Sequence, residues 1–351
     1  MENFGKFDDK QGQETVVYRF EDFRGKDLSG ENFLNVSIDV LQTIEFDTET
    51  IWPEKEKLPK NFNPEKLLEE SKNPGLGIKE LHEQGITGQG VVVAIIDQKL
   101  DVDHPEYKDS VVDYAEYDEE VERDGIGIHG PAVASLLVGK DCGVAPGAKL
   151  VYRAVPCGRN FLPYAKALKN IIEDNKNFPQ NEKVRVVSCS IGYMLDKPEP
   201  GLDEWVDTLK KAKEAGIFVL DAGDDQIGIL FCCGGSPGNK NDFESYLPWL
   251  EEGNKEQDEE RKNGIVVPSD YRTMASSCNK EGQYMYNGKG GASWSIPYRA
   301  GLFALILQVN PNIRREEIAE IINESAIVNK KGLRIINPKG IIDLAEERIK
   351  S

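Results

Sequence analysis

Residues 91–96 read Val-Val-Val-Ala-Ile-Ile and lead directly into Asp97. A continuous apolar run of this length, mostly β-branched, is typical of a strand buried on both faces of a parallel sheet. Similar runs occur at residues 149–155, 184–190, 217–220 and 265–267, and helical patterns at residues 131–138, 164–173 and 202–215 separate most of them. This alternation predicts an α/β fold: a doubly wound, mostly parallel sheet with helices on both faces.

The remaining stretches define the expected domain organisation. Residues 1–74 are polar, and we interpret them as an N-terminal accessory segment and linker packed on the main domain. A cleavable propeptide or an inhibitory arm is the alternative interpretation. Residues 75–351 are expected to form the main domain. Within it, residues 225–262 break the alternation with clustered glycines and a charged run, which predicts a surface insertion.

Composition narrows the range of partners and compartments. The 351 residues include 43 basic and 61 acidic side chains, a net charge of −18, which argues against nucleic acid and anionic membrane surfaces and favours partners with basic residues. No apolar run is long enough to span a membrane, and the N-terminus lacks the pattern of a signal peptide. The six cysteines have no zinc-type spacing. We interpret them as reduced thiols and expect a cytoplasmic protein.

A second stretch with chemical meaning is residues 290–297, Gly-Gly-Ala-Ser-Trp-Ser-Ile-Pro, which precedes the almost wholly apolar residues 299–309. Because proline is tolerated in the first turn of a helix, the pattern places Ser293 at the N-terminus of a buried helix. Unsatisfied backbone N–H groups and the helix dipole favour negative charge at that position. A serine that merely caps the helix is the alternative.

Two further side chains complete a candidate catalytic group. His129 stands in Gly-Ile-His-Gly-Pro at the start of an apolar helix, and Asp97 ends the buried strand described above. The order Asp, His, Ser is one of the known orders of serine-hydrolase triads. It predicts that Asp97 orients His129, that His129 acts as general base, and that Ser293 is the nucleophile.

At four blocks the sequence resembles the subtilisin-like serine peptidases (subtilases, peptidase S8-like), over roughly residues 75–330. Residues 90–107 resemble the aspartate block of that family, residues 127–134 with 143–148 the histidine block, residues 187–192 the substrate-binding strand, and residues 291–301 the serine block. The resemblance implies a subtilisin-like fold and a serine endopeptidase that works through an acyl-enzyme. It also implies that Ser190, Ile191 and Gly192 bind the substrate backbone.

One departure from the family pattern bears on activity. The resemblance places the oxyanion hole at the backbone N–H of Ser293 and at residue 224, where the family has asparagine and this chain has Asp224. An ionised carboxylate cannot donate a hydrogen bond, so we expect a slow or narrowly specific peptidase. A catalytically weak pseudopeptidase that binds peptides or proteins as a regulator is the alternative, and an esterase is a third.

The resemblance also bears on cofactors. The stretch between His129 and Pro146 is short for the family, which implies that its calcium-binding loop is missing, although Glu106 lies near a family ligand position. We therefore predict no metal ligands and no cofactor, and leave calcium open.

Overall fold

A central five-stranded sheet organises the fold in the computed structural model, which describes residues 6–8, 14–16, 21–118, 125–194, 197–223, 228–248, 264–277 and 282–349. The strand order is β5 (Val111–Glu116), β6 (Lys149–Ala154), β4 (Val92–Asp97), β7 (Val184–Ser188) and β8 (Phe218–Leu220), and every neighbouring pair is parallel. The predicted α/β class is confirmed. Only β5 escapes the sequence pattern, because this edge strand is partly exposed and has no continuous apolar run.

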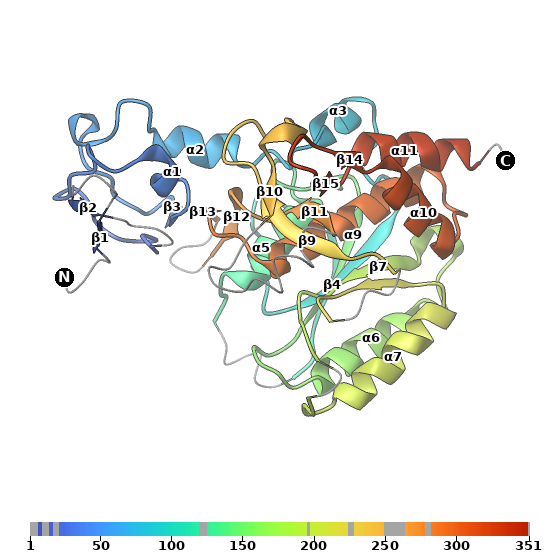
Figure 1. Cartoon of the computed structure of the whole chain (residues 1–351). Helices are drawn as coiled ribbons and strands as arrows, with labels where there is room; N and C mark the ends of the chain where they lie inside the picture. The colour runs from blue at the N-terminus through green and yellow to red at the C-terminus, as the bar shows by residue number, and fades with distance from the viewer. Residues whose placement is uncertain are drawn as a thin grey trace.

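Helices cover both faces of this sheet. The amphipathic helices α6 (Leu162–Asp174) and α7 (Leu202–Glu214) lie side by side on one face and share its apolar core. The other face packs against the buried helices α5 (His129–Val138) and α9 (Ala292–Val309) (Figure 1). The shorter helices α3 (Ile78–Glu83), α10 (Arg315–Ser325) and α11 (Pro338–Glu347) extend this second layer.

A second, mixed sheet has the order β10 (Leu247–Pro248), β9 (Phe231–Gly235), β11 (Ile265–Pro268), β15 (Arg334–Ile335) and β14 (Ile327–Val328). Strand β9 lies within residues 225–262, which we expected to form a surface insertion, and it pairs in parallel with β11. That part of the expectation is wrong. The strand escaped detection because it contains Gly234, where a Cβ atom would overlap the backbone of Leu247 on the neighbouring strand. Residues 249–263 lie outside the described part of the chain.

The N-terminal segment joins a third sheet. The hairpin of β12 (Arg272–Ser276) and β13 (Gln283–Asn287) gains β3 (Glu45–Asp47) as an antiparallel neighbour of β13. An aromatic cluster supports this pairing, since the Phe46 ring lies 5.1 Å from Tyr286 on the hairpin and 5.3 Å from Trp52. The segment therefore contacts the main domain through strand pairing, with β3 beside β13 (Figure 1). Aromatic packing adds to this contact. The boundary at residue 74 stays a prediction.

The other N-terminal elements are short. They are β1 (Lys6–Asp8) paired with β2 (Glu14–Val16), α1 (Ile38–Leu41), the 3₁₀ turn η1 (Lys55–Lys57) and α2 (Pro64–Glu70). Helix α2 has a typical helix start, with Asn63 accepting a hydrogen bond from the Lys66 N–H and Pro64 in the first turn. Two further 3₁₀ turns, η2 (Gln180–Glu182) and η3 (Phe243–Ser245), lie in connections of the main domain.

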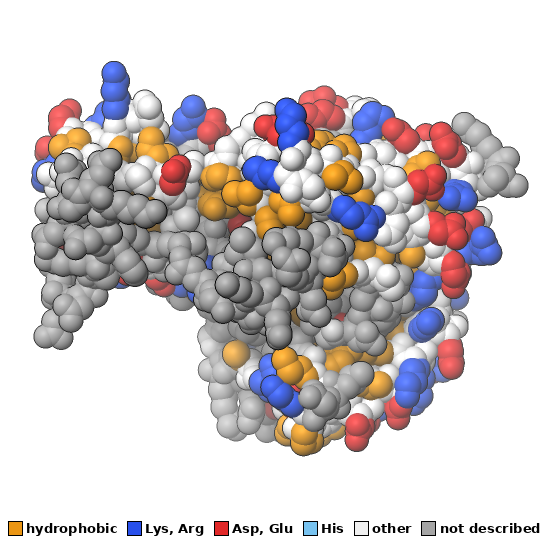
Figure 2. All heavy atoms as spheres, in the orientation of Figure 1, with side chains coloured by type: hydrophobic (Ala, Val, Ile, Leu, Met, Phe, Trp, Pro, Cys, Tyr) orange, Lys and Arg blue, Asp and Glu red, His pale blue; other side chains and the backbone are white. Residues whose placement is uncertain are grey.

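The surface carries mixed charge on the face that Figure 2 draws. Basic and acidic side chains lie interspersed over the described part of that face. Among the described residues, no helix is long and apolar enough to cross a membrane.

Candidate active site

Asp97 lies at the carboxyl end of β4, the middle strand of the central sheet. The residue is only 4% exposed. Its Oδ1 atom accepts one hydrogen bond from the Gln98 N–H at 2.8 Å and contacts Nδ1 of His129 at 2.6 Å. A buried carboxylate with these two partners is held in one orientation, and it faces the imidazole that the sequence assigned to it.

His129 is the first residue of α5. The next residue, Gly130, has no side chain, which allows the start of α5 to lie close to Asp97. A Cβ atom at Gly130 would stand 2.5 Å from the Lys99 carbonyl oxygen and 2.6 Å from that of Gln98. Burial by itself would lower the pKa of His129, but the charge and the hydrogen bond of Asp97 together outweigh it and raise the pKa above its ordinary value. Nδ1 contacts the carboxylate, so Nε2 is the nitrogen left to exchange a proton with a nucleophile.

Ser293 is the second residue of α9 and is half-buried. The following residue, Trp294, places its ring 5.2 Å from the His129 ring, with a tilt of 38° between the planes. The N-termini of α5 and α9 therefore meet beside the end of β4. In the described part of the chain no hydrogen bond joins His129 to Ser293, which is common for a free enzyme in which the catalytic hydrogen bond tightens on substrate binding.

Pro297 does not lie in the first turn of its helix, as the sequence suggested, because α9 already begins at Ala292. A proline in the second turn cannot donate to the carbonyl four residues earlier, which belongs to Ser293. That carbonyl oxygen instead accepts a hydrogen bond from the Ser190 Oγ at 2.9 Å. Because Pro297 has no N–H, the Ser293 carbonyl oxygen is available to accept from Ser190. This hydrogen bond links the end of β7 in the central sheet to helix α9.

Ile191 and Gly192 continue past the end of β7 without forming a strand of their own. The Ile191 carbonyl accepts a hydrogen bond from the Ala222 N–H at 3.0 Å, and the Gly192 carbonyl accepts one from Arg159 at 3.2 Å. These residues thus run alongside residues 222–223, and the two segments lie together beyond the carboxyl ends of β7 and β8. Their part in substrate binding stays a prediction.

Asp224 lies outside the described residues, so its side chain is not placed. The chain leading to it contains a buried carboxyl group that sequence reasoning missed. The Asp221 Oδ1 accepts a hydrogen bond from the Gly223 N–H at 3.1 Å. Burial raises the pKa of Asp221 to about 6, against opposing hydrogen bonds and the charge of Arg299. The doubled aspartate in Asp-Ala-Gly-Asp was the only sign of it in the sequence.

A second missed carboxyl group supports the loop before Ser293. Asp270 follows β11, is 6% exposed, and accepts a hydrogen bond from the Ser269 Oγ at 2.5 Å. Its carboxylate lies directly against Gly290, because a Cβ atom at that glycine would overlap it. Gly290 has a left-handed φ of 76°, so glycine is required there for both space and backbone conformation.

Glu106, near the position at which the family resemblance suggested a calcium ligand, makes protein contacts on both carboxylate oxygens. Oε1 accepts hydrogen bonds from the N–H groups of Asp141 at 2.8 Å and Cys142 at 2.6 Å, and Oε2 accepts one from the Tyr284 hydroxyl at 2.8 Å. These donors give both oxygens of the buried carboxylate hydrogen-bond partners. Among the described residues, no group of three or more His, Cys, Asp or Glu side chains could hold a metal ion.

The comparisons with known proteins point to one family. The model of the subtilase family (Peptidase S8) matches residues 88–341. The chain is 25% identical over 301 residues to the subtilisin-like protease PopC of Myxococcus xanthus, covering 77% of this chain and 62% of that protein. It is 29% identical to an intracellular serine protease of Paenibacillus polymyxa, covering 65% and 70%. For a calcium-dependent protease of Nostoc, at 25% identity, the matched part spans only 42% of the relative.

Solved structures show the same fold. The structure of the subtilase cytotoxin SubAB assembly matches with a TM-score of 0.58 at 16% identity, covering 78% of this chain and 96% of that chain. Fervidolysin from Fervidobacterium pennivorans matches with a TM-score of 0.54 at 16% identity, covering 77% and 45%. With the family model spanning most of its length, and the Asp97–His129 contact beside the Ser293 helix, this chain belongs to the subtilase family.

Proposed function

We propose that this chain is a serine endopeptidase that hydrolyses peptide bonds through Asp97, His129 and Ser293. The observation that carries the proposal is the 2.6 Å contact between Asp97 and His129, at the point where the start of the Ser293 helix meets the start of α5. The family match over residues 88–341 supports it.

The proposed reaction follows from the roles of these groups. Nε2 of His129 takes the proton of the Ser293 hydroxyl as Oγ attacks the scissile carbonyl carbon. The imidazolium that forms is stabilised by Asp97 and then protonates the leaving amine. A water molecule, activated by the same histidine, hydrolyses the acyl-enzyme. These steps need no cofactor. Calcium binding is tested separately, by titrating the protein with calcium.

Two groups are proposed for the oxyanion hole. The first is the N–H of Ser293, in the first turn of α9, where backbone donors have no partner within the helix. The second is Asp224, which can donate only when its carboxyl group is protonated. In subtilisin itself, loss of one oxyanion-hole donor costs roughly 10²–10³ in kcat. We therefore propose a slow peptidase with greater activity on the acid side of neutrality, limited at lower pH by protonation of His129.

The substrate is proposed to be an extended peptide lying along Ser190, Ile191 and Gly192, by strand-like backbone pairing. The net charge of −18 favours basic side chains near the scissile bond.

Two relatives are named as intracellular serine proteases, from Paenibacillus polymyxa and Bacillus subtilis. These names support a cytoplasmic location, as does the spacing of the six cysteines, which are scattered along the sequence.

Labelling with a fluorophosphonate between about pH 5 and about pH 9, the range in which an imidazole titrates, tests the proposal. Wild-type protein, Ser293→Ala and Asp224→Asn are compared. We expect wild-type labelling that is lost in Ser293→Ala and is faster, over a wider pH range, in Asp224→Asn. Labelling of Asp224→Asn alone would favour the pseudopeptidase that binds peptides as a regulator. No labelling of either protein would refute a working triad.

A further inference from the structure

Strand β13 pairs with β3 of the N-terminal segment and leads directly into the loop that presents Ser293. Its last residue, Asn287, pairs with Glu45 of β3. One residue later, the Gly288 N–H donates to the Ile44 carbonyl at 3.1 Å. A Cβ atom at Gly288 would overlap the carbonyl oxygen of Gln42. The N-terminal segment is therefore packed backbone against backbone at the base of this loop.

The side chain of Asn287 links this contact to the loop itself. Its Nδ2 donates to the Oε1 of Glu45 at 3.0 Å, and its Oδ1 accepts a hydrogen bond from the Gly290 N–H at 2.6 Å. An amide group has one donor end and one acceptor end. Because Glu45 occupies the donor end, the acceptor end is directed at Gly290, and the orientation of the amide is fixed by the N-terminal segment.

Gly290 is held from a second side by Asp270, as described above. It adopts a left-handed conformation, with a φ of 76°, and stands three residues before Ser293. A shift of its N–H would therefore be transmitted along a very short connection to the nucleophile. The Asn287 hydrogen bond is a direct polar contact through which the N-terminal segment can set that position.

The surroundings of Glu45 fit a structural carboxylate in a partly desolvated position. Burial raises the pKa of Glu45, while the nearby charge of Arg24 opposes the rise. The Nη2 atom of Arg24 lies 3.5 Å from the Oε2 of Glu45, whereas Asn287 contacts the other oxygen. The two carboxylate oxygens thus have separate partners, one in the N-terminal segment and one at the nucleophile loop.

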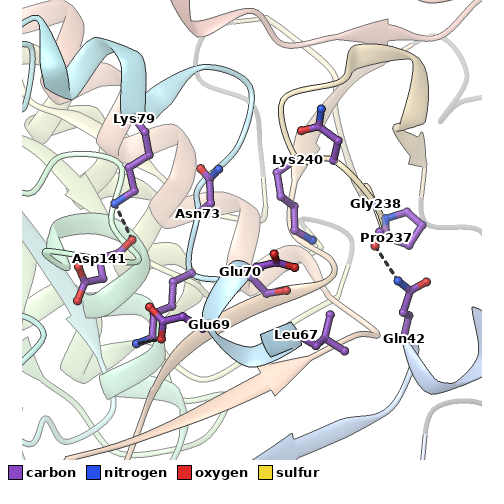
Figure 3. A pocket seen from close by; sticks show the side chains of 13 residues that line it. Gln42, Leu67, Glu69, Glu70, Asn73, Lys79, Asp141, Pro237, Gly238 and Lys240 are labelled. Atoms are coloured by element: carbon purple, nitrogen blue, oxygen red, sulfur yellow. Dashed lines mark hydrogen bonds and ion pairs between the residues drawn. The ribbon is translucent and has the colours of Figure 1, made fainter. Parts of the chain in front are cut away.

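A further contact holds the segment beside the main domain. Figure 3 shows Gln42 reaching toward Pro237, and its Nε2 donates to the Pro237 carbonyl at 2.9 Å. This contact borders a polar pocket of about 720 Å³ between the two parts of the chain, which also includes Lys79 and Lys240 in its lining. None of the three proposed catalytic residues lines the pocket. This pocket is therefore separate from the proposed catalytic residues, and the described contact of the N-terminal segment that leads toward Ser293 is its pairing with β13.

We propose that Glu45 is a positioning residue for Ser293, acting through Asn287 and Gly290, so that the N-terminal segment is a lasting part of the working enzyme. This inference rests on the proposed function. It opposes the alternative in which the segment is a propeptide removed on activation, because removal of Glu45 would release the donor end of the Asn287 amide.

The test is the rate at which a fluorophosphonate labels Ser293, measured well below the melting temperature of each variant. Glu45→Leu removes the acceptor, whereas Glu45→Gln keeps an oxygen for Asn287 and removes only the charge. Glu56→Leu, at an exposed position of the same segment, is the matched control. We expect Glu45→Leu to label on the order of ten to a hundred times more slowly, as for a small misplacement of a catalytic group. Glu45→Gln and Glu56→Leu should label at nearly the wild-type rate.

A double-mutant cycle identifies the route. If Glu45 acts through Asn287, then Glu45→Leu combined with Asn287→Leu should label no more slowly than Asn287→Leu alone. A merely structural role would lower the melting temperature and leave the labelling rate unchanged. Labelling of Glu45→Leu at the wild-type rate would overturn the inference while leaving the proposed function intact. Absence of labelling in wild type and in Asp224→Asn would overturn both.

Discussion

Asp270 offers a quantitative prediction, because this buried carboxyl group supports the loop before the nucleophile. Burial raises its pKa to about 7 from an ordinary value of 3.8, although the Ser269 hydrogen bond and the charge of Lys240 oppose the rise. Folding therefore favours the protonated carboxyl group. Its contribution to stability is fully present below about pH 3.8 and is lost as the pH rises through about 7.

The magnitude follows from the size of this difference in pKa. At 1.36 kcal/mol per pH unit, the rise from 3.8 to about 7 corresponds to roughly 4 kcal/mol of folding free energy. Roughly 3 kcal/mol of this falls between pH 5 and pH 9. An asparagine side chain has nearly the same shape as the carboxyl group but does not titrate. The variant Asp270→Asn should therefore become more stable relative to wild type by about that amount as the pH rises across this range.

The assay is urea unfolding at pH 5, 7 and 9, followed by circular dichroism and fluorescence to confirm a single transition. The buried ammonium of Lys240 and all other groups titrate in both proteins, so the difference between them isolates Asp270 and its coupling to its neighbours. Asp109→Asn, at an exposed position, is the control and should show no such trend. A difference between wild type and Asp270→Asn that stays constant from pH 5 to pH 9 would refute the reasoning.

Two further predictions concern the supports of the site. Glu106→Gln replaces one carboxylate oxygen with an amide nitrogen, which cannot accept the hydrogen bonds that Asp141 and Cys142 donate to one oxygen or that Tyr284 donates to the other. We expect the free energy of unfolding to fall by about 1–3 kcal/mol. An unchanged urea midpoint would contradict this. Gly130→Ala would push the start of α5 away from the Gln98 carbonyl and lengthen the Asp97–His129 contact, so fluorophosphonate labelling should slow about tenfold or more. Gly125→Ala, where a Cβ atom meets nothing within 4 Å, is the control and should label normally.

The sequence by itself determined the fold class and the candidate catalytic residues. A β-branched run ending in Asp97 predicts a central parallel strand, because a strand buried on both faces cannot carry polar residues along its length. Chemistry at the ends of such strands is expected from the topology alone. Asp97 stands at the end of such a strand and was predicted to orient His129. In the structure its Oδ1 lies 2.6 Å from the Nδ1 of His129.

Other features were hidden because their signals are not local. The sequence of strand β9 resembles a glycine-rich loop. Its glycines are required by close neighbours and not by a turn, because Gly234 lies against Leu247 of β10 and Gly235 lies against Asp270. The position of Pro297 depended on where α9 begins, which is directly after Gly290 and Gly291, and Gly290 packs against Asp270 from a distant part of the chain. Propensity cannot supply that information, because the decisive contacts come from elsewhere in the chain.

Only the tertiary structure decided how the N-terminal segment relates to the site. Glu45 and Asn287 lie 242 residues apart in sequence, and no sequence pattern around either residue indicates that the two side chains are in contact. Periodicity reports which face of an element is buried, but it does not report which distant side chain completes a hydrogen bond at the end of a strand. That choice depends on the register between β3 and β13, which the aromatic contact of Phe46 with Tyr286 supports, and registers are set by packing in three dimensions.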